Sequence, residues 1–161
     1  SANIVLLTHK EAKSGVDRIQ GFLDTIEGHT EYQVIAETDT QGQIERALPK
    51  VEQMIEEHTY IDVIMALNEP AAMGALAALD SKNCREGVLV YGVDGSPEAK
   101  KLIAEGMMTG TSAQFPKKIG AQAIKSAYQI LNGEEVDANV VIPVEMITKN
   151  NIEEFDISRW Q

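Results

Sequence analysis

Short apolar runs alternate with longer segments of helical periodicity along the whole chain. The apolar runs are typical of buried strands, and they read NIVLL at 3–7, YQVIAET at 32–38, DVIMAL at 62–67, GVLVYGV at 87–93 and GTSAQ at 110–114. A further extended stretch, NVVIPVEMIT, covers 139–148. Between these runs, apolar residues recur at helical spacing, which predicts helices over 14–27, 43–57, 70–79, 96–106 and 116–131. Ser14 is the predicted N-cap of the first helix.

The regular alternation of strands and helices determines the expected fold class. Short connections between a strand and the next helix favour a mostly parallel sheet with helices on both faces, which is a three-layer α/β sandwich. The 161 residues are enough for one domain with a substantial core, and they contain no internal repeat and no evident linker. We expect hinges near 112–116 and near 139–143.

Composition excludes several classes of function. The chain has 25 acidic and 14 basic residues, a formal net charge of −11, so nucleic-acid phosphates would repel it. We therefore expect no nucleic-acid partner. There is no run of eighteen apolar residues that could span a membrane. Cys84 is the single cysteine, and His9, His29 and His58 share no ligand spacing, so we expect no disulfide, no metal site and no cofactor.

Polar side chains follow the predicted strands at the edge where parallel sheets bind ligands. Asn68 follows the third strand, Asp94 ends the fourth, Gln114 ends the fifth, and Arg18 lies one turn into the first helix. A carboxylate accepts from two hydroxyls, an amide both donates and accepts, and a guanidinium donates in a fixed fork. This set suits a sugar-like ligand.

Two of these residues also have an ordinary structural interpretation at a turn or helix start. Asn68 or Glu69 could cap the helix that begins at Pro70. Glu69 also suits the positive end of a helix dipole, and we leave it out of the site for that reason. Asp94 stands before Gly95 and could serve turn chemistry alone.

The other two residues have surface alternatives. Gln114 could be an ordinary polar group at a sheet edge, and Arg18 could pair with Asp17 or Glu27 on a solvated face. The convergence of polar groups from several strands on one edge favours a binding site. Catalysis fits less well, because the sequence lacks a nucleophile elbow, a phosphate loop and a dinucleotide fingerprint. We therefore expect a binding protein and not an enzyme.

Four ordered motifs resemble a known family: SGVDRIQGF, MALNEPAAMGAL, VYGVDGSPEAKKLI and GTSAQFPKKIGAQAI. They look like the carboxyl-terminal lobe of type I periplasmic binding proteins, of which the ribose- and galactose-binding proteins of ABC transporters are the nearest type. The resemblance implies a flavodoxin-like or Rossmann-like lobe. It also implies sugar contacts from Arg18, Asn68, Asp94 and Gln114. The loop after the second strand, DTQGQ, lacks the aromatic residue that the family often has there.

The resemblance also implies what the 161 residues do not contain. The family has two lobes that close on the sugar, and the chain matches only the second, so we expect an amino-terminal lobe upstream of Ser1 as a partner. Residues 116–138 are expected to cross to that lobe, and their apolar stripe could otherwise support a homodimer through helix 116–131. An ABC permease would be the membrane partner.

Location and role follow the same resemblance. We expect a periplasmic or extracellular protein, anchored as a lipoprotein in a Gram-positive cell. Two alternatives share this lobe, the ligand-sensing domain of a lactose-repressor-type regulator and that of a receptor kinase. The ending VEMITKNNIEEFDISRW looks like that of the transport proteins rather than the repressors. The identity of the sugar stays open.

Overall fold

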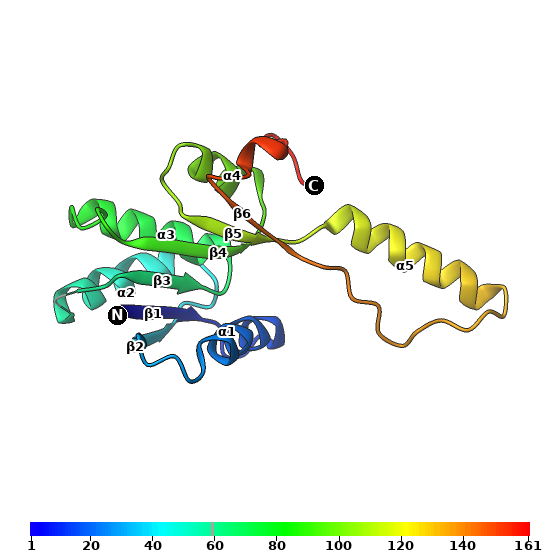
Figure 1. Ribbon diagram of the computed structural model, residues 1–161, viewed down its shortest axis with the longest axis horizontal. Helices are drawn as coiled ribbons and strands as arrows, with labels where there is room; N and C mark the ends of the chain where they lie inside the picture. Colours follow the sequence, from blue (N-terminus) through cyan, green and yellow to red (C-terminus); the bar gives the residue numbers. More distant parts are fainter. Residues whose placement is uncertain (59) are drawn as a thin grey trace.

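A computed structural model describes residues 1–58 and 60–161 of the chain. Strands and helices alternate as the hydrophobic pattern predicts (Figure 1). The elements are β1 (Ala2–Thr8), α1 (Lys13–Ile26), β2 (Tyr32–Asp39), α2 (Ile44–Glu57), β3 (Val63–Ala66), α3 (Glu69–Ser81), β4 (Leu89–Asp94), α4 (Pro97–Ala104), β5 (Gly110–Ala113), α5 (Pro116–Leu131), β6 (Glu145–Thr148) and the 3₁₀ turn η1 (Ile152–Glu154).

One six-stranded sheet organises the molecule, in the order β2-β1-β3-β4-β5-β6. Strands β1 to β5 pair in parallel, and β6 adds an antiparallel edge strand against β5. The expected mostly parallel α/β sheet is confirmed. The carboxyl ends of β1, β3, β4 and β5 therefore meet at one edge, and the side chains that follow these strands are brought together there.

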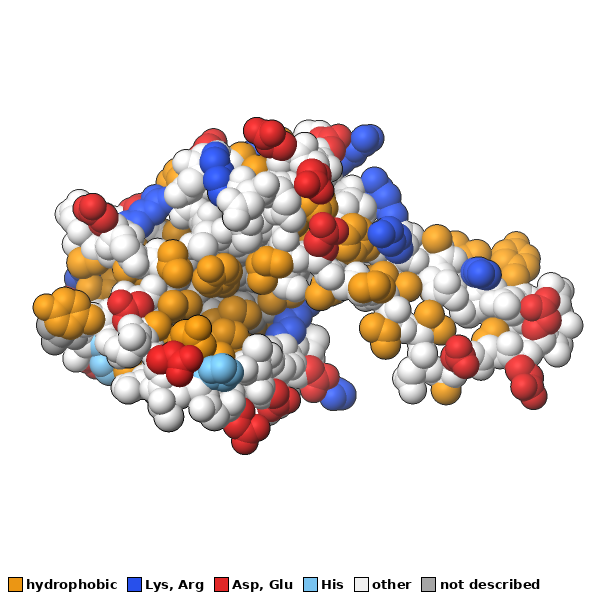
Figure 2. Space-filling model, viewed as in Figure 1, with side chains coloured by type: hydrophobic (Ala, Val, Ile, Leu, Met, Phe, Trp, Pro, Cys, Tyr) orange, Lys and Arg blue, Asp and Glu red, His pale blue; other side chains and the backbone are white. Residues whose placement is uncertain are grey.

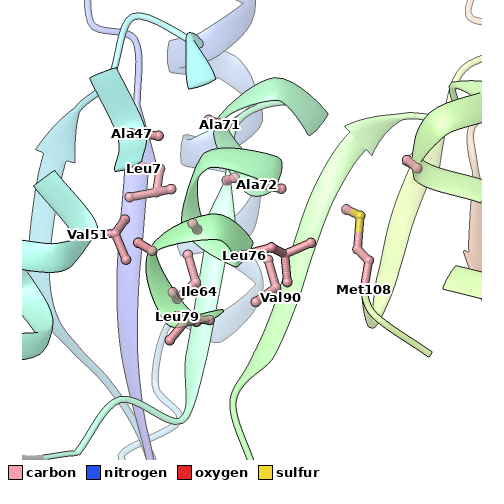
Figure 3. Close-up of a cluster of buried hydrophobic side chains, with 14 of the residues drawn as sticks. Leu7, Ala47, Val51, Ile64, Ala71, Ala72, Leu76, Leu79, Val90 and Met108 are labelled. Atoms are coloured by element: carbon pink, nitrogen blue, oxygen red, sulfur yellow. The ribbon is translucent and has the colours of Figure 1, made fainter. Parts of the chain in front are cut away.

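Alternate residues of the central strands face two different helix layers, which explains why NIVLL is apolar throughout. Ile4 and Leu6 of β1 pack with Ile19 of α1 on one face. Val5 and Leu7 belong to the larger core on the other face, under α2, α3 and α4. Figure 3 shows part of this core, in which small alanines of α3 let the helix approach the sheet closely. Strand β1 is therefore buried on both of its faces.

The α1 face of the sheet is only partly covered. Leu89 of β4 pairs with Val63 of β3, whose side chain belongs to the α1 core, so Leu89 faces the same way. Leu89 is 44% exposed, and Met146 of β6 is 49% exposed. Figure 2 shows apolar side chains gathered on this side of the body. An uncovered apolar face of this kind is typical of a surface that binds another protein segment.

Helix α5 runs away from the sheet instead of covering it (Figure 1). None of its residues is buried, and its apolar side chains stay open, including Ile124 at 62% and Leu131 at 81% exposed. The return segment after α5 is irregular until β6 begins at Glu145, so the extended stretch predicted over 139–148 forms a strand only in its last four residues. Among the described residues, no helix is long and apolar enough to cross a membrane.

The predicted start of the first helix is wrong by one residue. Helix α1 begins at Lys13 with Ala12 as its N-cap, and no side chain caps it. A turn in which the Ala12 N–H donates to the His9 carbonyl leads into the helix instead. Gly15 then packs so closely on that carbonyl that a Cβ would lie 2.8 Å from the oxygen. This tight backbone approach, rather than a Ser14 cap, sets the helix start.

Candidate ligand-binding site at the carboxyl edge of the sheet

Three of the four predicted site residues form one connected cluster. Asp94 ends β4, and its Oδ1 accepts a hydrogen bond of 2.8 Å from Gln114 Nε2. Arg18 Nη2 lies 3.3 Å from the same oxygen, with both side chains about a quarter exposed. The arrangement places a guanidinium, a carboxylate and an amide from three separate segments around one partly open point, where they can donate to and accept from a ligand.

Arg18 does not make the surface pairs that its sequence neighbours suggested. Its Nη1 donates to the Leu67 carbonyl at 3.0 Å, and its ion pair is with Asp94. Asp17 is instead paired with Lys13, at 2.8 Å. Adjacent residues on a helix point in different directions, whereas residues four apart share a face. Arg18 therefore turns toward the sheet edge while Asp17 stays on the solvated side.

Asn68 stands at the same edge but does what the capping interpretation predicted. Its Oδ1 accepts from the Ala71 N–H at 3.0 Å, which caps α3. Its Nδ2 donates to the Gly42 carbonyl at 3.1 Å, tying the loop after β2 to the start of α3. The loop approaches so closely that a Cβ on Gly42, whose φ is +66°, would lie 2.6 Å from Nδ2. Asn68 has no direct hydrogen bond to Asp94 among the described contacts.

The backbone of Asp94 is strained in a way that a plain turn does not require. Its φ is +145°, in a region that residues with a Cβ rarely adopt. Its side chain bonds to Gln114 and Arg18 rather than to the turn that follows. Strain of this kind persists where surrounding structure enforces it, most often at sites of function.

The Asp94 carboxyl group is also held in an electrostatically unfavourable place. Burial raises its pKa above the ordinary aspartate value, and the neighbouring Glu69 carboxylate raises it further, against the opposing effects of Arg18 and Gln114. Holding the charged Asp94 carboxylate at this edge of the sheet therefore costs the folded chain electrostatic free energy. Hydroxyl donors from a ligand would relieve that penalty, because hydrogen bonds to a carboxylate favour its charged form.

Glu69, which we left out of the predicted site, has a supporting role behind it. Glu69 is buried, and its carboxylate accepts from the Gly95 N–H at 2.6 Å, the Ser96 N–H at 3.0 Å and the Thr111 hydroxyl at 2.6 Å. It lies behind the loop that carries Asp94 and fixes that loop to β5. In the sequence, an acid at the start of a helix is explained well enough by its favourable interaction with the helix dipole. The packing of α3 beside β4 is what directs the Glu69 carboxylate into the interior.

No metal centre accompanies these groups in the described part of the chain, where histidine, cysteine and acidic side chains form no cluster of three.

Comparison with known proteins assigns the chain to a family. The family model described as "Periplasmic binding protein domain" matches residues 2–135. The chain belongs to the periplasmic binding protein family. The expected resemblance to that family is thereby confirmed.

The sequence of the chain is also similar to those of individual periplasmic binding proteins. The ribose import binding protein of Escherichia coli is 29% identical over 133 residues, which are 83% of this chain and 44% of that protein. The D-allose-binding periplasmic protein of the same organism is 31% identical over 112 residues, 70% of this chain and 36% of that protein.

Solved structures of family members overlay closely. A solute-binding protein from Actinobacillus succinogenes with bound D-allose has a TM-score of 0.91 at 26% identity, over 96% of this chain and 56% of that one. One from Bacillus halodurans with bound myo-inositol has a TM-score of 0.87 at 30% identity, over 96% and 54%. The chain spans about half the length of these relatives.

Proposed function

We propose that this chain is one lobe of a non-catalytic sugar-binding protein that serves an ABC importer. The observation that carries the proposal is the Arg18–Asp94–Gln114 cluster at the carboxyl edge of a family lobe. Asp94 accepts from ligand hydroxyls, Arg18 donates to ligand oxygens, and Gln114 does both. Asn68 contributes from the adjacent loop, where it also caps α3.

The relatives support a polyol as the class of ligand. The names of the curated relatives specify ribose and allose, and the solved structures hold D-allose and myo-inositol. These molecules share a rim of hydroxyls and an uncharged ring. The cluster presents acceptors and donors of matching kind within one small area.

The proposed mechanism is closure of two lobes on the sugar. This chain supplies one set of contacts and a second lobe supplies the other, so the sugar stabilises the closed state, in which it touches both. A membrane permease then recognises the closed form. The protein works in the periplasm or outside the cell, where a lipoprotein anchor would hold it in a Gram-positive organism.

The exposed surfaces described above support a crossing role for residues 116–138. Helix α5 has no buried residue, and the sheet face beside α1 exposes Leu89 and Met146. The second lobe covers these surfaces in the whole protein. In the 161-residue chain alone, a second copy exchanges α5 and covers them reciprocally, giving a homodimer.

Calorimetric titration with D-ribose, D-allose, myo-inositol and further pentoses and hexoses tests the function. The full-length protein should bind one of them tightly, and this chain alone weakly or not at all. Asp94→Ala should weaken binding by about 1.5–3 kcal/mol, because it deletes a charged acceptor. Asp80→Ala is the matched control, since Asp80 of α3 pairs with Arg85 at the surface and is not part of the cluster.

Two results would count against the proposal. Absence of binding to every sugar by the full-length protein would point to a different ligand or to a sensor. Equal affinities for wild type and Asp94→Ala would remove Asp94 from the site.

A further inference from the structure

One buried lysine of α4 makes hydrogen bonds to residues 156–161, at the end of the given sequence. Lys100 of α4 is fully buried, and its Nζ donates to the carbonyls of Asp156 and Arg159 at 2.8 and 2.6 Å and to Gln161 Oε1 at 3.1 Å. All three acceptors come from this segment, which we call the tail. A buried ammonium group needs such partners, so the tail is held tightly to α4.

The end of the tail lies against the two loops of the candidate site. Gln161 Nε2 donates to the carbonyl of Gln114. Gly95, directly after Asp94, has a φ of +86°, and a Cβ there would collide with the Gln161 side chain and with Ala113. The tail thus contacts the residues that follow both β4 and β5. Figure 1 shows this end of the chain beside α4.

Trp160 is carried by this fastened tail and borders the site on two sides. Its indole lines a hollow of about 310 Å³ together with Asp94, Pro70 and Met73. It also lines a second hollow of similar size with Gln114 and the start of α5. The side chain is 41% exposed, so much of an aromatic ring stays open beside the carboxylate and amide of the cluster.

We infer that Trp160 forms an aromatic wall of the sugar site and that Lys100 is the positioning residue that holds it there. The inference rests on the proposed function. Sugar rings carry apolar C–H faces between their hydroxyls, and aromatic rings with one open face suit such surfaces.

Calorimetry of the full-length protein with D-allose and D-ribose tests the wall. Trp160→Ala should weaken binding about tenfold, whereas Trp160→Phe, which keeps an aromatic face, should stay within about threefold of wild type. Unchanged affinity in Trp160→Ala, together with a loss in Asp94→Ala, would overturn this inference and leave the proposed function standing. Failure of the wild type to bind any sugar would overturn both.

The positioning role of Lys100 needs a readout that a general loss of stability would not produce. Lys100→Met removes the ammonium but keeps the length of the side chain, and it should weaken D-allose binding as much as Trp160→Ala does. The double variant should bind no more weakly than either single variant, because both remove the same wall. Additive losses would overturn the role.

A milder variant keeps this test valid if Lys100→Met does not fold. Gln161→Ala removes only the two bonds of the Gln161 side chain, to Lys100 and to Gln114. The carbonyls of Asp156 and Arg159 still accept from Lys100, so no buried charge is left without a partner. It should lower D-allose affinity about threefold in wild type and leave the affinity of Trp160→Ala unchanged. An equal loss in both backgrounds would contradict positioning through Trp160.

Discussion

The buried Glu69 carboxylate offers the sharpest test of how the loop carrying Asp94 is held. Three donors converge on it: the N–H groups of Gly95 and Ser96 and the Thr111 hydroxyl. In Glu69→Ala these donors lose their acceptor in a buried place. Each buried donor left unsatisfied costs about 1–3 kcal/mol, so allowing for partial rescue by water we expect a loss of about 3–6 kcal/mol in the free energy of unfolding.

Urea unfolding measures that loss. At a slope of about 2 kcal/mol/M, a loss of about 4 kcal/mol lowers the midpoint by about 2 M. Glu69→Gln should lie between wild type and Glu69→Ala, because its amide keeps one acceptor oxygen but turns an N–H₂ toward a donor. The Asp94 loop should loosen in both variants, so sugar affinity of the full-length protein should fall as well.

Glu45→Ala is the matched control, since Glu45 also lies in the first turn of a helix but is exposed. Both acids interact favourably with a helix dipole, worth about 0.3–1 kcal/mol, so only the buried hydrogen bonds differ. If Glu69→Ala destabilised the chain no more than Glu45→Ala, our account of the loop would be refuted.

Three further predictions concern charge, backbone strain and association. Burial raises the pKa of Asp94, so the stability that its proton contributes is present at low pH and is lost as pH rises through that pKa. Asp94→Asn should therefore have a higher melting temperature than wild type at pH 7. The difference in melting temperature should disappear at about pH 4. Gly95→Ala should lower the melting temperature more than Gly87→Ala, since both glycines have positive φ but only Gly95 is crowded. Ile124→Glu on α5 should weaken self-association of the chain in sedimentation equilibrium, and Ala121→Glu should not; a monomeric wild type would contradict the homodimer.

The sequence alone was enough for the order and type of the elements. Strands buried on both faces appear as short continuous apolar runs, whereas helices show apolar residues at intervals of three or four. This spacing can be read from the sequence without knowing which elements pack together. The same local signals placed Asp94 and Gln114 at the ends of strands. Topology then brings those ends to one edge, so convergence of polar groups could be expected before any distance was known.

The tertiary structure decided which of the competing local roles each polar residue takes. Arg18 had acids nearby in sequence, yet it pairs with Asp94, which is 76 positions away, because its helix face turns toward the sheet. Glu69 and Lys100 look like surface charges in sequence, and both are buried with hydrogen bonds to groups that are distant along the chain. Trp160 lies beside Asp94 in a tail that Lys100 and Gln114 bind. Periodicity reports burial along one element, whereas the partner of a charge depends on how separate elements pack, and no local pattern encodes that.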